Sequence, residues 1–481
     1  MPPATEPISR HPGGRSRSTL GSGLASLRRR ATRQARGPWR AGAGVSENNA
    51  ARPVGCYPTG GTMPAVNPEI LVWARETAGL TLQDAVAKVG IRDARGVAAV
   101  DRLTALERGE DKPTRPVLVR MAHHYRRPLL AFYLNAPPRR DERGPDFRTL
   151  PGARSSETDA LIDALVRNVQ SRQNMVRAAL QAEDEAEPLL FVGALLRDED
   201  ADTGIQSIRR LLRRKAEIAR LSQRAVRLLR QVLGELDVAS YYAEATADDA
   251  FRLLRSRTEA AGVFVLLQGD LGSHHTAIDV EAFRGLAIAD DIAPFVVIND
   301  NDSRAAWSFT LLHELTHLLL GQTGFSGADS ETEVEQFCNN VAAEWLLPAR
   351  TLDEVEIGRG WDVAEQGRRI GEFARERNLS RTMVAYRLLR AKRIDRQAFE
   401  HLRTGFRQQW RESRAYHRAR ARKSEGGPSY YVVRRHRVGP GLLTFTHRMV
   451  DSGALSTTKA AKVLGVKPAQ VGRMLRGPKA R

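Results

Sequence analysis

The sequence predicts a mixed α+β fold that is mostly helical, and three observations support this expectation. Most of the 481-residue chain has apolar residues at helical spacing, in segments that Gly and Pro separate. Three short runs in the middle of the chain, 262–268, 283–291 and 294–300, are instead rich in β-branched and apolar residues, which indicates a small sheet. Basic residues gather at both ends, which indicates separate terminal modules.

The charge distribution separates the ends of the chain from its middle. The formal net charge is +19. Residues 1–62 hold ten Arg and two Glu, and residues 401–481 hold nineteen basic and three acidic residues, which leaves 63–400 with a charge of −5. Contact with nucleic acid, if there is any, is therefore expected at the ends.

Composition also indicates the compartment. The chain has two cysteines, Cys56 and Cys338, which excludes a disulfide framework and favours a reducing cytosol. No apolar run is long enough to span a bilayer, and the start of the chain lacks the apolar core of a signal peptide. We expect a cytoplasmic protein without membrane contact.

The amino-terminal region divides at Met63. Residues 1–62 are rich in Arg, Gly, Ser, Pro and Ala, and are predicted to form a disordered arm. Met63 begins a segment that looks like a domain start, so translation from Met63 is the alternative for this arm. Residues 63–135 contain four short helical patterns, and the second begins at the capping residue Thr81.

These helices resemble the XRE-type helix-turn-helix domain. The resemblance rests on Glu107-Arg108-Gly109 with Pro113, because a similar signature follows the recognition helix in that family. Two departures are visible, since eight residues (91–98) replace a tight turn and Leu82 stands where Gln is common. A helical protein-interaction module is the alternative. The resemblance implies that Arg102, Thr104 and Arg108 contact DNA.

Residues 136–155 are predicted to be a proline-punctuated linker, and 156–400 to form the central domain. Amphipathic helices are expected at 156–182, 203–233 and 247–261, ahead of the three strands. The most informative residues follow these strands, in the apolar segment 309–321, where His313-Glu314-Leu315-Thr316-His317 forms an HExxH motif.

The spacing of this motif suits a metal ion. His317 lies four positions after His313, so both imidazoles project from one face of a helix. Glu314 stands where a general base would take a proton from a metal-activated water. A chance match is the alternative, but burying these three polar groups without partners would cost several kcal/mol. The motif therefore predicts a zinc hydrolase.

A catalytic zinc site needs a third protein ligand. The next helical segment, 331–348, follows breaks at Gly321 and Gly324, so it can pack back on the first helix. Glu335 lies one turn from Cys338 on the face expected to be buried, and is the favoured ligand. Acidic residues in the first turn can instead interact favourably with the helix dipole, without binding a metal. The other glutamates available are Glu331, Glu333 and Glu344.

Together these segments resemble the ImmA/IrrE metallo-endopeptidases. HELTHLLL and EQFCNNVAAEWLLP correspond to that family's HExGH and AN-x-FAAE-x-LMP patterns. The resemblance implies that His313, His317 and Glu335 bind Zn²⁺, with Glu314 as general base. Thr316 stands where the family often has Gly, and Cys338 where it often has Ala. A buried apolar thiol is the favoured interpretation of Cys338, and a soft zinc ligand is the alternative.

The strands before the motif are consistent with a zincin-like metallopeptidase domain, in which an edge strand holds the substrate backbone. Arg284 and Asn299 resemble family positions around that sheet, without an assigned role. His274 and His275 are candidates for stabilising a tetrahedral intermediate, although a solvated loop pair is the more usual interpretation.

Two regions follow the central domain. Residues 401–440 interleave basic residues with aromatic ones and are predicted to be a basic linker, a composition that also suits nucleic-acid binding. Residues 441–481 are predicted to form a helix-turn-helix-like helical module, in which Lys467, Gln470 and Arg473 would contact DNA. The alternative is a helical hairpin for dimerisation, which would make the protein a homodimer.

The sequence thus predicts a zinc-dependent endopeptidase coupled to DNA-binding modules. By resemblance its substrate would be a regulatory protein, such as a repressor of stress genes, so that cleavage regulates transcription. One alternative is a DNA-binding regulator whose zinc domain senses without turnover. Another is a toxin–antitoxin-like interaction protein.

Overall fold

The computed structural model describes residues 66–138, 156–197, 208–209, 212–213, 215–326, 332–358, 360–423, 427 and 429–476. The predicted arm 1–62 and most of the predicted linker 136–155 lie outside these residues. The described part is mostly helical and contains a small sheet, as the sequence predicts for an α+β fold.

The amino-terminal region is a small helical bundle with its own apolar core. Thr81 and Asp84 form a capping box at the start of its second helix. Between the second and third helices, residues 94–97 make a tight bridged turn, in which Arg95 and Gly96 have positive φ angles of 55° and 76°. The Arg75 guanidinium binds both carboxylate oxygens of Glu107, at 2.7 and 2.9 Å, and joins the first helix to the third. The elements are α1 (Pro68–Glu76), α2 (Leu82–Val89), α3 (Ala99–Arg108), α4 (Arg115–His124) and η1 (Leu129–Tyr133).

The sheet lies at the centre of the rest of the described chain. Its order is β1-β3-β2-β4; β1 and β3 are parallel, and the other two pairs are antiparallel. The three predicted runs supply β1 (Phe264–Leu267), β2 (Gly285–Ile288) and β3 (Phe295–Ile298). The edge strand β4 (Gly324–Ser326) was not predicted, because its three residues are too short to show an alternating pattern.

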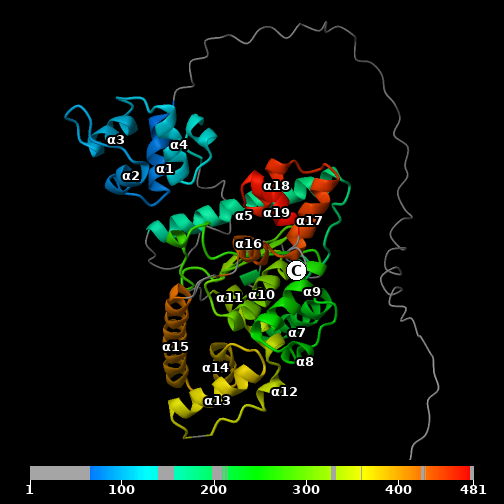
Figure 1. Cartoon of the computed structure of the whole chain (residues 1–481). Helices are drawn as coiled ribbons and strands as arrows, with labels where there is room; N and C mark the ends of the chain where they lie inside the picture. The colour runs from blue at the N-terminus through cyan, green and yellow to red at the C-terminus, as the bar shows by residue number, and fades with distance from the viewer. Residues whose placement is uncertain are drawn as a thin grey trace, which may run out of the picture. The chain divides into compact units, whose positions relative to one another are not determined.

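One face of the sheet packs against the helices that carry the HExxH motif and the segment after it. The alternate strand residues Val265, Leu267, Val296 and Ile298 share a buried core with these helices. In Figure 1 the helices that share this core run from green through yellow to orange. The helices that contribute to this core are α7 (Lys215–Val232), α8 (Val238–Tyr242), α9 (Ala247–Ala260), α10 (Arg304–Leu319), α11 (Glu333–Leu346), α12 (Ala349–Leu352), α13 (Val363–Glu376), α14 (Arg381–Arg390) and α15 (Arg396–Lys423).

The other face packs against one long helix and the last helices of the chain. Leu266, Leu286 and Val297 belong to this second core, so the strands are apolar on both faces. The predicted helix 156–182 is present with these bounds as α5 (Ser156–Ala182). The helices from the chain end are α16 (Tyr430–Val438), α17 (Pro440–Asp451), α18 (Thr457–Leu464), η5 (Pro468–Gln470) and α19 (Val471–Leu475).

A buried ion pair fastens this carboxyl-terminal region to the central domain. Arg255 and Glu259, one turn apart on α9, pair at 3.1 Å, and both side chains are 5% exposed. Arg255 also donates to the carbonyls of Val265 and His436, and Glu259 accepts from the Gly441 amide at 2.9 Å. Residues 430–476 therefore pack directly on the domain, and α15 and α16 occupy most of the predicted linker 401–440. Among the described residues, no helix is both long and apolar enough to cross a bilayer.

Candidate metal centre

Helix α10 holds the HExxH motif inside the protein. It passes beneath β2 and β3 and packs against α7, α9 and α11, so it is enclosed on several sides. Every residue from Thr310 to Leu319 is buried. The exposed fractions of His313, Glu314 and His317 are 3%, 0% and 2%. Three polar side chains so deep in an apolar core require a partner of their own.

Helix α11 brings the predicted third ligand to the two histidines. Its amino-terminal cap is Thr332, whose hydroxyl accepts from the Glu335 amide. One carboxylate oxygen of Glu335 lies 3.1 Å from His313 Nε2, and the other lies 3.2 Å from His317 Nε2. The two Nε2 atoms are themselves 3.2 Å apart. The structure thus brings the side chains of His313, His317 and Glu335 together at one point.

The donor atoms of this triad fit a metal ion. His313 Nδ1 lies 2.9 Å from Asn339 Oδ1, which can only accept, so this contact places the proton of a neutral imidazole on Nδ1. The lone pair of His313 Nε2 then faces the Glu335 carboxylate and the Nε2 atom of His317. Two ligands about 2.0–2.1 Å from a tetrahedral zinc ion would be roughly 3.3 Å apart. The observed 3.1–3.2 Å separations match such a ligand set.

The charges around the triad shift the pKa values of its members. Burial raises the pKa of Glu335, but the nearby His317 and His313 outweigh this effect, and its pKa lies well below the ordinary range. Burial likewise lowers the pKa of His317, whereas Cys338 and Glu335 raise it, and the net pKa is well above its ordinary value. These groups interact strongly, which is typical of a functional site.

Glu314 lies beside the triad and keeps one oxygen free of hydrogen bonds. Ser326 Oγ on β4 donates to its Oε1 at 2.6 Å, and its Oε2 has no hydrogen-bond partner among the described residues. Burial raises the pKa of Glu314, while the two histidines of the motif oppose the change. A carboxylate with a raised pKa and an unoccupied oxygen is suited to accept a proton.

Two glycines on the sheet make room for the motif. A Cβ atom at Gly285 on β2 would lie 2.8 Å from Glu314 Cδ, and one at Gly324 on β4 would lie 2.5 Å from His317 Nδ1. Both distances are shorter than real Cβ contacts. Glycine at these positions therefore allows the sheet to approach the base and one candidate ligand closely.

Cys338 is a fourth group at the centre. Its side chain is fully buried, and its Sγ lies within 4.8 Å of ligand atoms of His313 and His317. Burial raises the pKa of this thiol, and His317 opposes the shift. The soft-ligand alternative for Cys338 therefore has a geometric basis that the sequence pattern does not show. The remaining predicted alternatives lie elsewhere: Glu333 pairs with Arg213, Glu344 pairs with Arg387, and Glu331 is outside the described residues.

Several supporting residues were not singled out from the sequence. Ser326 and Gly285 had no local signal, because their contacts with Glu314 depend on how the sheet packs against α10. Asn339 belongs to the family-like segment 335–348, so its position in that pattern was the one available signal.

The other residues noted around the sheet have structural contacts. Asn299 is buried, and its amide donates to the carbonyls of Ile278 and Phe283. Arg284 is exposed, and its backbone bonds Ser326 and Asn299. His275 is exposed in the 274–276 turn, and the His274 side chain lies outside the described part.

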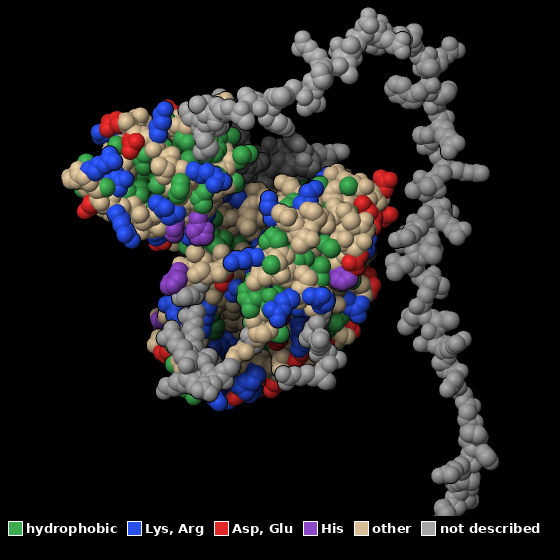
Figure 2. Space-filling view, turned by 45° about the horizontal axis from the view of Figure 1, so that its top comes forward, with side chains coloured by type: hydrophobic (Ala, Val, Ile, Leu, Met, Phe, Trp, Pro, Cys, Tyr) green, Lys and Arg blue, Asp and Glu red, His purple; other side chains and the backbone are tan. Residues whose placement is uncertain are grey.

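The residues predicted to contact DNA lie in two separate regions of the chain, on α3 and in the last two helical elements. On α3, Thr104 donates to the Val100 carbonyl at 2.9 Å and Arg102 donates to the Arg92 carbonyl, whereas Arg108 is exposed. On the face shown in Figure 2, Lys and Arg side chains are scattered among polar and apolar ones. At the chain end, Lys467 and Gln470 line a cavity, and the Arg473 guanidinium lies 5.0 Å from the centre of the Tyr431 ring.

Comparison with protein families bears directly on this centre. Residues 268–389 match the family model Peptidase_M78, the IrrE N-terminal-like domain. The matched segment includes both histidines, Glu314, Glu335 and Cys338, together with β2, β3 and β4. The match supports the ImmA/IrrE family and indicates a metallopeptidase domain. Neither the curated proteins nor the solved structures compared with the chain gave a match.

Proposed function

We propose that the chain is a zinc-dependent endopeptidase coupled to DNA-binding modules, and that it cleaves a regulatory protein such as a repressor to control transcription. The observation that supports this most is the convergence of His313, His317 and Glu335 within 3.1–3.2 Å, beside a general base with one oxygen free of hydrogen bonds. Three protein ligands and a separate carboxylate are the parts that a catalytic zinc site needs.

In this proposal the triad would hold Zn²⁺. When bound, the ion supplies a Lewis acid that polarises a peptide carbonyl and makes a water molecule more acidic. Asn339 Oδ1 accepts a hydrogen bond from His313 Nδ1–H, which would keep the lone pair of His313 Nε2 available to a bound ion. Glu314 Oε2 takes the proton of the attacking water and delivers it to the departing amine. Ser326 holds the other oxygen, which keeps Oε2 available.

The edge of the sheet suggests how a substrate would bind. β4 is an edge strand, paired with β2 on one side, and its Ser326 contacts the general base. A peptide in extended conformation that added to β4 would lie next to Glu314. This mode recognises the backbone, so it suits a flexible segment of a protein substrate.

The DNA-binding part of the proposal is carried by the terminal helices. The bundle 66–138 has an exposed Arg108 at the end of α3, and its helix order suits a helix-turn-helix. Binding to DNA would bring the peptidase close to DNA-bound regulators. Loss of sequence-specific binding in Arg108→Ala, with unchanged metal content, is the expected result in a gel-shift assay.

Cys338 favours a second candidate function. If its thiolate bound the ion together with the triad, four protein ligands would close a tetrahedral site, as in structural zinc centres. The domain would then sense zinc and regulate DNA binding without turnover.

Glu314→Gln distinguishes the two candidates. The amide cannot take up a proton, but it removes no proposed ligand, so zinc content should be unchanged. For an endopeptidase, hydrolysis of a library of internally quenched peptides should fall by at least about 100-fold, since general base catalysis contributes roughly 10²–10⁴-fold. Equal hydrolysis by wild type and Glu314→Gln would contradict the mechanism. His313→Ala is the matched control, because it should lose zinc and activity together.

A further inference from the structure

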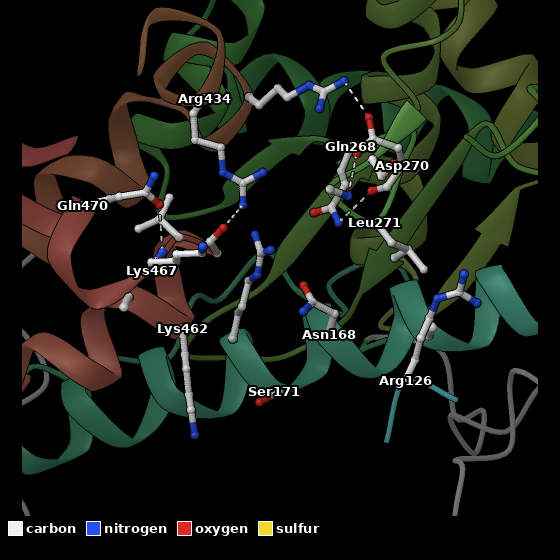
Figure 3. A pocket seen from close by; sticks show the side chains of 18 of the residues that line it. Arg126, Asn168, Ser171, Gln268, Asp270, Leu271, Arg434, Lys462, Lys467 and Gln470 are labelled. Atoms are coloured by element: carbon white, nitrogen blue, oxygen red, sulfur yellow. Dashed lines mark hydrogen bonds and ion pairs between the residues drawn. The ribbon is translucent and has the colours of Figure 1, made fainter. Parts of the chain in front are cut away.

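A large cavity lies away from the metal centre, beside the carboxyl-terminal helices. Its volume is about 1160 Å³, and α5, the loop 268–273 after β1, α16 and the α18–η5 segment enclose it. Figure 3 shows Arg434, Gln268 and Asn168 reaching into this space from different elements. Among its described lining residues Asp270 is the acidic one, and the other charged residues are basic. Asp270 is already paired with Arg437 at 2.9 Å.

Arg172, at the cavity wall on α5, is a buried cation without a counter-charge. Its exposed fraction is 4%, and no described carboxylate pairs with it. Its Nε has no hydrogen-bond partner among the described residues. Transferring such a charge from water into a protein costs several kcal/mol unless an anion compensates for it.

The guanidinium of Arg434 lies beside that of Arg172, and both lie against Gly465. Arg434 from α16 donates to the carbonyls of Leu464 and Gly465, at 3.0 and 2.7 Å. Both arginine side chains lie so close to Gly465 that a Cβ there would collide with each of them. Burial, and then the charge of Arg434, lower the pKa of Arg172 to about 9. Two cations held together in a cavity make a site for an anion.

We propose that this cavity binds a small molecule that carries phosphate groups, of nucleotide size. Guanidinium groups bind phosphate oxygens through paired charge-assisted hydrogen bonds, and two of them can share one phosphate. The cavity is as large as typical ligand pockets, and Gln268, Asn168 and Gln470 provide neutral polar contacts. The depth of Arg172 favours a small mobile phosphate over the backbone of a DNA duplex, which remains outside a buried pocket.

This site is independent of the proposed peptidase activity. Its walls come from α5, α16 and α18, so a bound phosphate would join segments far apart in the sequence. Lys467 and Gln470, predicted to contact DNA, line this cavity and would contact the small ligand instead.

Thermal unfolding of the full chain with ATP, pyrophosphate or a short DNA duplex tests the proposal. ATP and pyrophosphate should raise the Tm of the wild type. Arg172→Met should be at least as stable as the wild type without ligand, because it removes a buried unpaired charge. It should bind ATP at least about tenfold more weakly, because the loss of a hydrogen bond to a charged group weakens binding by that factor or more. Lys459→Gln is the matched control, because Lys459 is exposed on α18 outside the cavity and should leave binding unchanged.

Lys467→Gln provides a second variant that cannot disturb the interior, because this residue is exposed at the cavity mouth. It should weaken ATP binding severalfold and reduce its dependence on salt. Unchanged ATP affinity in both Arg172→Met and Lys467→Gln would overturn the proposal, as would a wild type that neither ATP nor pyrophosphate stabilises. A duplex that displaces ATP, and that Arg172→Met no longer binds, would assign the cavity to DNA instead.

Discussion

A single methyl group at Gly285 should reduce turnover and leave the metal site intact. The new Cβ of Gly285→Ala would lie 2.8 Å from Glu314 Cδ and 2.7 Å from Thr310 Cγ2. Ordinary contact begins near 3.4 Å, so the Glu314 carboxyl group must move by at least about 0.6 Å. Because a misplacement of about 1 Å can cost roughly 10²-fold in rate, we expect a loss between about 10- and 100-fold.

The same change at Gly324 should act on the metal instead. A Cβ at Gly324 would lie 2.5 Å from Nδ1 of His317 and 2.7 Å from its Cγ, so the imidazole ring must move. This displaces Nε2 from its position 3.2 Å from Glu335. Zinc affinity should therefore fall by about 10- to 100-fold, as it does when other supports of a ligand are altered.

Zinc content, zinc affinity in competition with a chelator, and hydrolysis of quenched peptides distinguish the two variants. Gly405→Ala is the control, because a Cβ there meets nothing within 4 Å, and all three readouts should stay at wild-type values. If Gly285→Ala bound zinc and retained full turnover, Glu314 would not be the base. If Gly324→Ala retained full zinc affinity, the assignment of His317 as a ligand would fail.

Three further predictions concern two residues at the candidate metal centre and the buried ion pair on α9. The Co²⁺-loaded wild type should show a sulfur-to-metal charge-transfer band that Cys338→Ala lacks if the thiolate is a ligand; identical spectra would assign Cys338 to the apolar core. Asn339→Ala should weaken zinc binding by about 10- to 100-fold through the His313 tautomer, and unchanged affinity would remove this support role. Glu259→Gln leaves Arg255 buried and unpaired, and should lower the free energy of unfolding measured in urea by about 3–5 kcal/mol. The double variant Arg255→Met/Glu259→Met should recover most of that loss. A loss below about 1 kcal/mol in Glu259→Gln would show that water reaches the pair.

The parts of the centre that could be predicted from the sequence are those with local spacing. His313 and His317 share a helix face by their separation alone, and Glu335 follows on the next amphipathic segment. The predicted strand runs and the helix 156–182 also correspond to observed elements, because apolar periodicity is a property of neighbouring residues. The contacts made by Ser326, in contrast, depend on pairing between strands far apart in the sequence.

The carboxyl-terminal helices show a second limit to what the sequence predicts. Their apolar faces and capping residues predict helices, but an apolar face does not specify which element of the protein packs against it. In the structure these faces cover the sheet, and residues Val438, Leu442 and Phe445 join its core. The basic residues of this region likewise do not reveal from the sequence whether they face solvent or a cavity. Lys467, predicted to contact DNA, lines a cavity in the structure, and its contact with DNA stays a prediction.

The register of β4 links the metal, the base and the substrate edge. Gly324 and Ser326 are two residues apart, so they face the same side of the strand, and that side lies on α10. Gly324 lies against His317 and Ser326 against Glu314, three residues apart on one helix face. A slip of one residue would remove both small residues from the centre at once. In the proposed peptidase, the strand that would offer its edge to a peptide is therefore the strand that positions the proposed base and one proposed ligand. Recognition of the substrate backbone and the geometry of hydrolysis would then both depend on the three residues of β4.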